Sequence, residues 1–317
     1  MKTILGFLKL VRVVNLLMIA LSVSLFYYFI VVPNHQFQLS TKLLPFTTTD
    51  FVLFVVSLML VAAAGNIVND YFDFELDKEY KPERPLPQGI FSLDTAMYMH
   101  AAFAFAGIGL GFYLGWGYNY TKVGYMYIIA VLLLYVYSSY LQKVALAGNV
   151  VIAALTGFVF VLLMMFEINF LNTVHFDNAD NLVILLRQAV VFYAGFAFLT
   201  NLAREIVKDL EDMEGDAAFN IQTLPVQFGE RVAKAVAALV LLVMMGALGY
   251  FIKGFWDARA LKEFFYLFAL VFIPTLLTLG VLLNAKDKKD FAFVHILLKT
   301  IMLIGLLSIP LFYLLNH

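Results

Sequence analysis

Residues 65–77, Gly-Asn-Ile-Val-Asn-Asp-Tyr-Phe-Asp-Phe-Glu-Leu-Asp, are where a long apolar run ends and carboxylates begin to recur at helical spacing. Asp70, Asp73 and Asp77 stand at positions i, i+3 and i+7, and Asn69 precedes Asp73 by four residues. On an α-helix these side chains fall on one face. Like charges so arranged repel each other unless a cation lies among them. We therefore interpret the stretch as the metal-binding end of a helix.

A second acidic stretch repeats this spacing far downstream. In residues 209–216, Asp-Leu-Glu-Asp-Met-Glu-Gly-Asp, the three aspartates Asp209, Asp212 and Asp216 follow another apolar run. Hard cations such as Mg²⁺ prefer carboxylate oxygens and commonly bridge them to the phosphates of a substrate. A single acidic run at a loop edge is usually only a solvated face. Two runs of matched spacing favour one shared site, of a kind that suits a diphosphate.

The composition is that of an integral membrane protein. Of the 317 residues 63% are hydrophobic and only 14% charged, and the mean hydropathy is +0.89. The net charge of −1 indicates no bulk attraction to nucleic acid, and we expect no nucleic-acid partner. The absence of cysteine excludes disulfides, thiolate nucleophiles and cysteine-ligated zinc. Nothing in the sequence indicates an obligate protein partner, and membrane lipid is the expected surrounding.

Nine windows are long and apolar enough to cross a bilayer, which predicts an all-α, polytopic fold. No linker of the kind found at domain boundaries separates them, so we expect one domain over residues 1–317. The nine windows are, in residue numbers, 10–32, 50–72, 94–117, 123–142, 146–166, 183–204, 231–252, 264–284 and 291–314.

The distribution of Lys and Arg predicts the orientation. With a cytoplasmic N-terminus, the connections at 73–92, 142–146, 205–230 and 285–290 are also cytoplasmic, and they carry most of the cations. Both acidic stretches then lie on the cytoplasmic side, most simply of the cell membrane. The opposite connections, at 33–49 and 167–182, show no spaced ligand set and are predicted to be connectors.

Cations stand beside both acidic stretches. Lys81 and Arg84 follow the first, and Arg204 and Lys208 precede the second. Arginine holds phosphate oxygens in a fork, whereas lysine acts as a mobile point charge. Such a mixture can neutralise a departing diphosphate as its charge grows.

Other polar residues within the spans leave two interpretations open. Asn15, Asn66 and Asn149 lie in or at the edges of spans, where an amide either bonds a neighbouring helix or contacts a substrate or metal. His295 and Lys299 are four residues apart in the last span. They mark either a polar path or an ordinary polar contact beside a lysine that reaches for the membrane surface.

These residues resemble the UbiA superfamily of intramembrane prenyltransferases over nearly the whole chain. The family motif Asn-x-x-x-Asp-x-x-x-Asp matches Asn69, Asp73 and Asp77, and its Asp-x-x-x-Asp motif matches Asp212 and Asp216. Further matches are Arg84-Pro-Leu-Pro-Gln-Gly, the pair Arg12 and Asn15, and residues 137–149 at the junction of the fourth and fifth helices. The proline that usually follows the first-helix arginine is missing, and Tyr80 stands where many relatives have Asn.

The resemblance implies nine transmembrane helices around a central cavity, Mg²⁺ as cofactor and an isoprenyl diphosphate as donor. Residues 204–216 with Thr223-Leu-Pro225 look most like the geranylgeranylglycerol-phosphate geranylgeranyltransferases. Geranylgeranyl diphosphate is then the expected donor and geranylgeranylglyceryl phosphate the lipid acceptor.

Residue types and resemblance together predict three sets of site residues. The expected catalytic residues are Asp73, Asp77, Asp212, Asp216 and Lys208. The expected substrate-binding residues are Arg12, Asn15, Lys81, Arg84, Lys143, Asn149 and Arg204. The expected metal ligands are Asn69, Asp70, Asp73, Asp77, Asp209, Asp212 and Asp216.

Two alternatives remain open at this point. The same fold could prenylate an aromatic quinone precursor or a tetrapyrrole, which a product assay would distinguish. A secondary transporter could instead couple its acids to cation flux, although its carboxylates would be expected near the membrane midplane.

Overall fold

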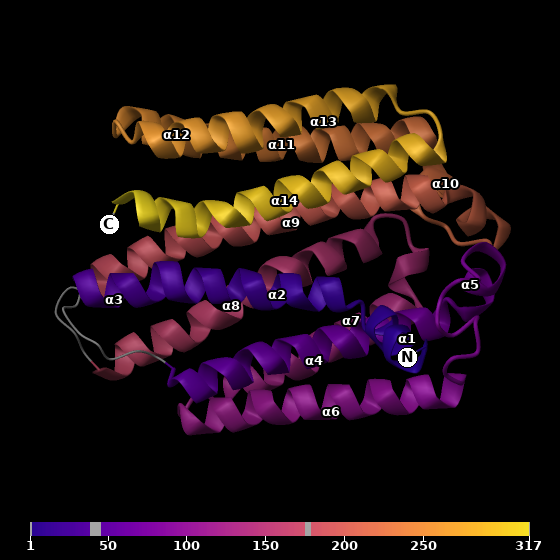
Figure 1. The fold of residues 1–317 in the computed structure, drawn as a ribbon, viewed down its shortest axis with the longest axis horizontal. Helices are drawn as coiled ribbons and strands as arrows, with labels where there is room; N and C mark the ends of the chain where they lie inside the picture. The colour runs from indigo at the N-terminus through magenta and orange to yellow at the C-terminus, as the bar shows by residue number, and fades with distance from the viewer. Residues whose placement is uncertain (1, 39–45, 175–178, 317) are drawn as a thin grey trace. The chain divides into compact units, whose positions relative to one another are not determined.

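The computed structural model describes residues 2–38, 46–174 and 179–316, and within these ranges it contains helices and no strand (Figure 1). An isolated bridge joins Val144 to Gln222. The longer helices are α2 (Val13–Phe26), α4 (Thr48–Phe72), α6 (Leu93–Gly117), α7 (Lys122–Ser139), α8 (Ala147–Val174), α9 (Ala179–Ala218), α11 (Glu230–Asp257), α13 (Ile273–Asn284) and α14 (Lys288–Asn316). The shorter ones are α1 (Lys2–Leu10), η1 (Tyr27–Val31), α3 (Val32–Gln38), α5 (Phe74–Tyr80), η2 (Leu141–Lys143), α10 (Leu224–Phe228), α12 (Leu261–Leu267) and η3 (Phe268–Phe272).

The predicted all-α membrane fold is confirmed. Nine helical segments of the described residues are long and apolar enough to span a bilayer, and each overlaps one predicted window. Two of the nine are composite, because α2, η1 and α3 form one span and α12, η3 and α13 another.

The π-helical segments inside these composite spans each precede a proline. η1 ends two residues before Pro33, and η3 ends two residues before Pro274. A proline lacks the amide hydrogen and its ring collides with the carbonyl four residues earlier. A locally widened turn accommodates that collision without ending the helix.

The boundaries of several connections are predicted wrongly. α9 runs to Ala218, so residues 205–218 are helical and not part of a connection. Apolar composition ends near residue 204, which closes a hydropathy window, but residues 205–214 contain neither Gly nor Pro and continue the helix. Likewise α8 extends to Val174 and α3 to Gln38, into segments expected to be connectors.

The helices fall into two compact units, which are described separately. Unit 1 comprises Met1–Leu141 and Val159–Arg187, and unit 2 comprises Gln142–Phe158 and Gln188–His317. The chain passes between them within η2, within α8 and within α9.

Unit 1 is built around α4, which packs against α6 and α7. Gly107 of α6 lies so close to α4 that a Cβ atom there would be 3.3 Å from the Ser57 carbonyl oxygen. The Ser57 hydroxyl lies 2.6 Å from the Tyr127 hydroxyl of α7. His100 Nδ1 of α6 lies 3.0 Å from the Ala64 carbonyl oxygen of α4. These contacts fix the rotation of α4 and therefore the direction in which its C-terminal acids point.

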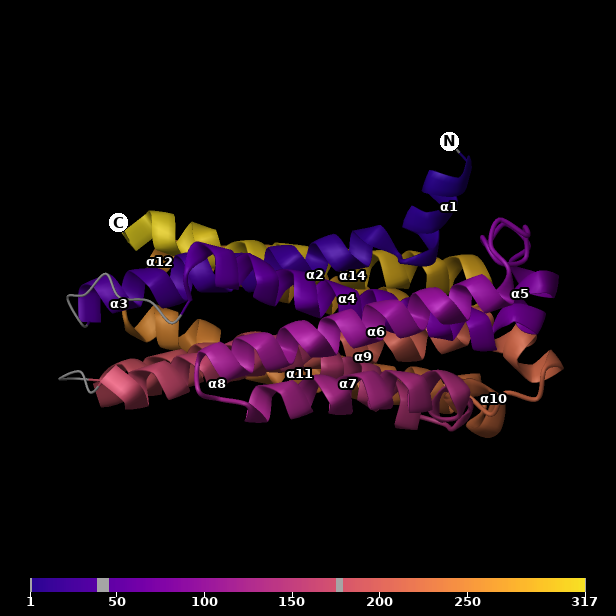
Figure 2. The same cartoon turned by 90° about the horizontal axis from the view of Figure 1, so that it is seen from below.

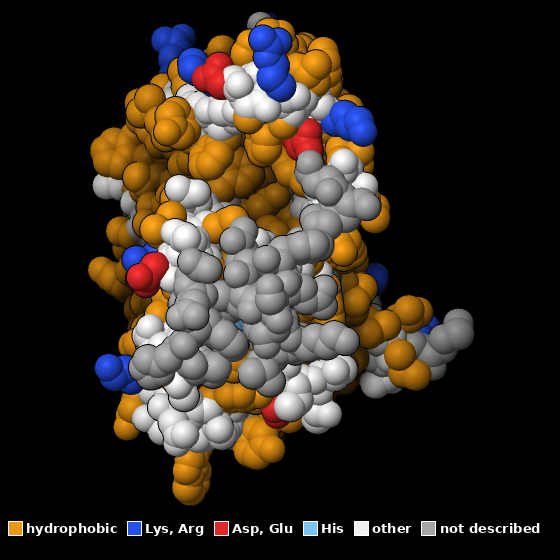
Figure 3. All heavy atoms as spheres, turned by 90° about the vertical axis from the view of Figure 1, so that its left-hand side faces the viewer, with side chains coloured by type: hydrophobic (Ala, Val, Ile, Leu, Met, Phe, Trp, Pro, Cys, Tyr) orange, Lys and Arg blue, Asp and Glu red, His pale blue; other side chains and the backbone are white. Residues whose placement is uncertain are grey.

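At the end of unit 1 remote from α5, His35 of α3 and Glu167 of α8 form a buried pair, with Nε2 and Oε1 2.5 Å apart. No ligand pattern marks these two residues in the sequence, and they are 132 positions apart. Seen from this end, hydrophobic side chains cover most of what the described residues present, and charged side chains are few (Figure 3). The pair ties the end of the first span to α8.

Unit 2 packs α9 against α11, α13 and α14 through small and aliphatic side chains. Its buried cluster includes Ile206 and Leu210 of α9, Ala237 of α11, Leu282 of α13 and Leu298 of α14. This core holds α9 well beyond its apolar part, and so it positions the second acidic stretch.

Candidate active site

The first acidic stretch occupies the turn between α4 and α5. Asp73 stands between the two helices, but its amide donates to the Asn69 carbonyl at 3.0 Å, and the Asp77 amide donates to the Asp73 carbonyl at 2.8 Å. Helical hydrogen bonding therefore continues through the break. The predicted common face of these residues is preserved.

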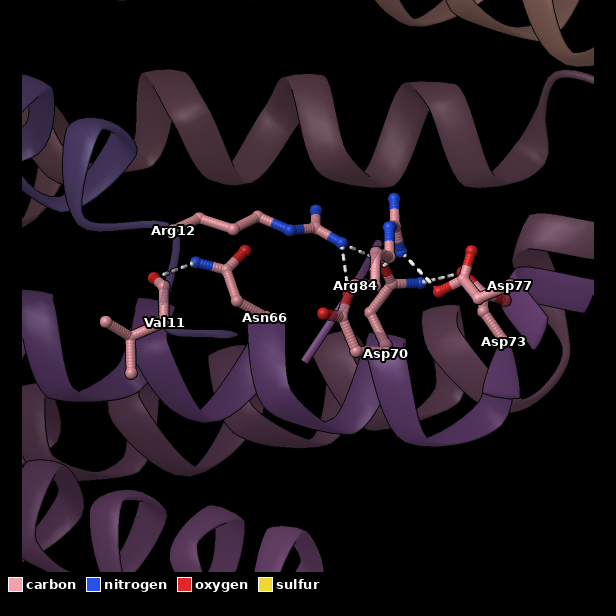
Figure 4. Close-up of polar contacts among 8 residues, drawn as sticks. Val11, Arg12, Asn66, Asp70, Asp73, Asp77 and Arg84 are labelled. Atoms are coloured by element: carbon pink, nitrogen blue, oxygen red, sulfur yellow. Dashed lines mark hydrogen bonds and ion pairs between the residues drawn. The ribbon is translucent and has the colours of Figure 1, made fainter. Parts of the chain in front are cut away.

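Two arginines from distant parts of the sequence converge on this face (Figure 4). Arg12 donates through Nη2 to Asn69 Oδ1 and to Asp70 Oδ1, both at 2.7 Å. Arg84 donates through Nη1 to Asp70 Oδ1 at 3.1 Å and to Asp77 Oδ2 at 2.6 Å. Asp70 and Asp77 are buried, and each is charge-paired to a guanidinium.

Arg12 reaches the site through a sharp change of chain direction between α1 and α2, which Figure 2 shows. Its backbone lies in the left-handed region, with φ 52° and ψ 57°, which a residue with a side chain adopts only at a cost. Asn66 of α4 stabilises this turn between α1 and α2 (called the elbow below), because its Nδ2 donates to the Val11 carbonyl at 2.9 Å. Leu10 and Ile67 pack beneath it in the apolar core of unit 1. The strain is thus maintained by packing and by the contacts of the guanidinium.

Asp77 retains one oxygen that is not satisfied by the protein. Its Oδ1 is buried and has no hydrogen-bond partner among the described residues. Burial raises the pKa of the Asp77 carboxyl to about 6, and the charge of Arg84 opposes that rise. An unpartnered carboxylate oxygen beside Asp70 and Asp73 fits a hard cation, which takes oxygen ligands. The donor set of this stretch therefore suits Mg²⁺.

Three further unit 1 residues that the sequence predicts for the site differ in where the structure places them. Lys81 lies within electrostatic range of Asp77, beside the cluster. Asn69 donates through Nδ2 to Asp73 Oδ2 at 3.1 Å and so joins the cluster directly. Asn15, by contrast, is exposed on α2 and takes no part in the hydrogen bonds of this group. Of the first-unit residues predicted for the site, Asn15 is therefore the one that the structure does not bring in.

The second acidic stretch lies on the last turns of α9 in unit 2. Asn149 of α8 donates through Nδ2 to Asp209 Oδ2 at 2.8 Å, which orients that carboxylate. The Thr223 hydroxyl donates to Asp216 Oδ2 at 3.1 Å. Asn220, with φ 55°, turns the chain back so that Thr223 reaches Asp216. The Thr-Leu-Pro segment after the motif is therefore a support for its last aspartate.

The three basic residues of unit 2 that were predicted for the site lie at different distances from the second acidic stretch. Arg204 bonds the neighbouring Glu205 through Nη2, and Lys208 follows one turn later on α9. Lys143 is exposed on η2, and no contact of the described residues ties it to the acids. The structure thus brings Asn149 and Lys208 to the second stretch, pairs Arg204 with Glu205 and leaves Lys143 apart.

Three residues that support the site in the structure are absent from the catalytic, substrate-binding and metal-ligand sets predicted from the sequence. Glu205 pairs with Arg204, Thr223 bonds Asp216 and Asn66 holds the elbow at Val11. Only Asn66 carried a signal, because an amide inside an apolar run needs a partner. Glu205 and Thr223 belonged to segments that resemble the family, but the sequence assigned neither of them a role.

Within the described ranges, no three Asp, Glu or His side chains converge closely enough to hold a metal ion. In the first stretch, the guanidinium groups of Arg12 and Arg84 stand against the carboxylates that would have to converge. The two acidic stretches belong to different units. That they share one metal site therefore remains a prediction.

Fold and site define a helical membrane protein with two aspartate motifs flanked by arginine and lysine, which agrees with a sequence-family match. The chain belongs to the UbiA prenyltransferase family, whose profile matches residues 37–301. It is accordingly a prenyltransferase, and the transporter alternative is abandoned. The matched region takes in both units and both acidic stretches.

Individual relatives give a more detailed comparison. A digeranylgeranylglyceryl phosphate synthase from Methanocaldococcus jannaschii is 33% identical over 305 residues, which cover 95% of this chain and 94% of that protein. The enzyme of the same name from Thermococcus kodakarensis is 32% identical over 206 residues, and the alignment spans 64% of this chain and 65% of that relative.

Solved structures agree in fold. One, from work on digeranylgeranylglyceryl phosphate synthase in membranes, has a TM-score of 0.61 at 26% identity and covers 98% of each chain. A UbiA homologue from Archaeoglobus fulgidus bound to DMAPP and Mg²⁺ has a TM-score of 0.55 at 15% identity, covering 96% of this chain and 99% of that one.

Proposed function

We propose that this prenyltransferase moves a geranylgeranyl group from geranylgeranyl diphosphate to the hydroxyl of geranylgeranylglyceryl phosphate, with Mg²⁺ as cofactor. The observation that carries the proposal is the buried acidic cluster at the end of α4, which two arginines hold in place and which retains an unsatisfied carboxylate oxygen. The name shared by the relatives from Methanocaldococcus jannaschii and Thermococcus kodakarensis supports the choice of acceptor.

The residues of the two stretches have separate tasks in this scheme. Asn69, Asp70, Asp73 and Asp77 would hold Mg²⁺ on one side, and Asp209, Asp212 and Asp216 on the other. Mg²⁺, when bound, supplies positive charge to the diphosphate oxygens. Lys81, Arg84 and Lys208 neutralise the remaining charge on the diphosphate as the bond between carbon one and oxygen breaks and the electron pair leaves with oxygen.

The apolar helices have the task of excluding water. Loss of the diphosphate leaves an allylic carbocation, which water would quench. A dry cavity preserves it until the acceptor hydroxyl attacks carbon one. The new carbon–oxygen bond makes an ether, and the hydroxyl proton passes to the released diphosphate.

We further propose that the chain lies in the cell membrane with its N-terminus and both acidic stretches at the cytoplasmic face. The stretches lie at the C-terminal ends of the second and sixth spans, and two span ends separated by four crossings lie on the same side. The concentration of Lys and Arg in the connections on that side supports the assignment.

The lack of cysteine makes this orientation directly measurable. Single-cysteine variants Glu83→Cys, after α5, and Lys262→Cys, in α12, alter exposed residues on opposite predicted sides. In intact cells, a membrane-impermeant maleimide should label Lys262→Cys at once and Glu83→Cys only after permeabilisation. The opposite order of labelling would reverse the proposed orientation.

Product identification tests the function itself. Purified protein with geranylgeranyl diphosphate, Mg²⁺ and geranylgeranylglyceryl phosphate should yield a doubly prenylated glyceryl phosphate ether by mass spectrometry. Quinone precursors supplied in parallel should remain unmodified. Exclusive prenylation of an aromatic acceptor would refute the proposed acceptor and keep the family assignment.

A further inference from the structure

Four basic side chains gather on one side of α9 in unit 2. Arg204 and Lys208 belong to α9, and His295 and Lys299 belong to α14. Lys299 lies within electrostatic range of Arg204 and Lys208. His295 Nδ1 lies 3.4 Å from Glu211 Oε2, which places α14 against the same side of α9.

The setting of this group argues for a function. Its four members lie on helices long and apolar enough to span the membrane, where ionisable residues are costly and usually serve a ligand or a pathway. Glu205 and Glu211 are the nearby carboxylates that act on Lys299. Arg204 and Lys299 thus face these two acids, because Lys208 also acts on Asp209 and is assigned to the diphosphate, and His295 adds a further basic group.

Two nitrogen atoms of the group lack partners. Arg204 Nε and His295 Nε2 are buried, and neither has a hydrogen-bond partner among the described residues. The Nε atom of arginine always carries a proton, so it is a donor left without an acceptor. Buried donors of this kind are rare in folded proteins. An anion with several oxygen atoms would satisfy Arg204 Nε, and it would also satisfy His295 Nε2 in the protonated imidazole, whose Nδ1 faces the Glu211 carboxylate.

The group is set apart from the second acidic stretch by its position around α9. Arg204, Lys208 and Glu211 are spaced to share one face, whereas Asp212 lies about 75° and Asp209 about 130° from the middle of that face at about 100° per residue. Along the axis, Lys208 and Asp212 are one turn apart, about 6 Å. Two anionic groups can thus be held side by side on one helix, one by the acids through a metal and the other directly by cations.

We propose that Arg204, His295 and Lys299 bind a phosphomonoester, the head group of the single-chain lipid acceptor. The assignment rests on the proposed function for the identity of that lipid. It separates the two phosphate-bearing substrates by chemistry, because the diphosphate needs a divalent cation and the phosphomonoester does not. Lys299 is the member whose side chain is exposed and able to meet an incoming head group.

The test measures binding without turnover. Radiolabelled geranylgeranylglyceryl phosphate is titrated into the purified full-length chain in detergent, with no donor present. Lys299→Met should raise the Kd about tenfold or more, as expected for loss of a charged hydrogen-bonding group. Lys299→Arg should restore most of the affinity. Lys289→Met, which removes an exposed lysine at the start of α14, should leave the Kd unchanged.

Competitors identify the chemistry that is recognised. Geranylgeranylglycerol, which has no phosphate, and a phosphodiester lipid such as phosphatidylglycerol should compete weakly, and inorganic phosphate should compete at high concentration. The Kd for geranylgeranyl diphosphate with Mg²⁺ should be the same in all variants, which also shows that each variant is folded.

Three results would overturn the assignment. They are an unchanged Kd in Lys299→Met, a loss confined to geranylgeranyl diphosphate, and equal binding of the acceptor with and without its phosphate. The proposed function is judged separately. If the phosphomonoester binds at these residues but no ether product forms, the site stands and the proposed reaction fails.

Discussion

Asp73→Ala and Asp212→Ala should each reduce turnover by about a thousandfold or more while leaving the protein folded in detergent, because each removes a charged group aimed at the leaving diphosphate. Asp73 stands at the turn between α4 and α5, and Asp212 lies on the last turns of α9. Both side chains are partly exposed, so their loss leaves no large cavity in the core. The measurement is the steady-state rate with saturating donor and acceptor.

Control variants in the same helices separate this effect from the loss of any one negative charge. Glu75→Ala, in α5, and Glu214→Ala, in α9, each remove an exposed carboxylate from the same elements. Both should retain near-normal rates. Near-normal turnover in Asp73→Ala or Asp212→Ala would refute the metal cluster, whereas equal losses in the control variants would show that the effect is not specific to the motifs.

Arg84→Met should nearly abolish activity and also destabilise the fold. The Arg84 guanidinium pairs with Asp70 and Asp77, whose side chains are 5% and 1% exposed. Removing one partner of a buried ion pair leaves an uncompensated charge, and with Arg84 itself 23% exposed we expect a cost of about 2–3 kcal/mol. Thermal unfolding in detergent should show a midpoint several degrees lower than that of the wild type.

Two comparisons identify the cause of this loss. Adding Asp77→Asn to Arg84→Met removes the stranded charge, so stability should recover while activity stays low. Mg²⁺ should raise the unfolding midpoint of Arg84→Met more than that of the wild type, because the metal replaces the missing positive charge. Lys78→Met, at an exposed site in α5, serves as the control. An unaltered midpoint in Arg84→Met would contradict the pairing.

Local patterns in the sequence predicted the membrane-spanning helices and the reaction class. Runs of apolar residues located nine spans, since a membrane helix needs no information beyond its own composition. The spacing of Asp70, Asp73 and Asp77 predicted one face, and helical hydrogen bonds preserve that face through the turn at Asp73. The family resemblance, confirmed by the match over residues 37–301, identified the reaction class.

Contacts between distant residues were not predictable in the same way. Arg12 bonds Asp70, which is 58 positions away, because a left-handed turn redirects the chain, and its predicted substrate-binding role did not include this contact. No glycine marks that turn, so the sequence carried no sign of it. The pairing of His35 with Glu167 likewise depends on how helices pack.

The length of α9 shows a second limit of prediction from sequence, which concerns where a helix ends. Hydropathy reports where a helix leaves the membrane and not where it ends, so the helical residues 205–218 were taken for a connection. The consequence for the site is favourable, since a continuous helix supported by Ile206 and Leu210 holds the second stretch more firmly than a loop would.

The central claim is that both acidic stretches bind one diphosphate through Mg²⁺. Isothermal titration with an unreactive thiolodiphosphate analogue of geranylgeranyl diphosphate tests it directly, in the wild type, Asp73→Asn and Asp212→Asn. We expect one analogue bound per chain in the presence of Mg²⁺, and at least a tenfold weaker Kd without Mg²⁺ or in either variant, about 1.4 kcal/mol of binding free energy. Binding that is independent of Mg²⁺, or that survives the loss of one motif unchanged, would contradict it.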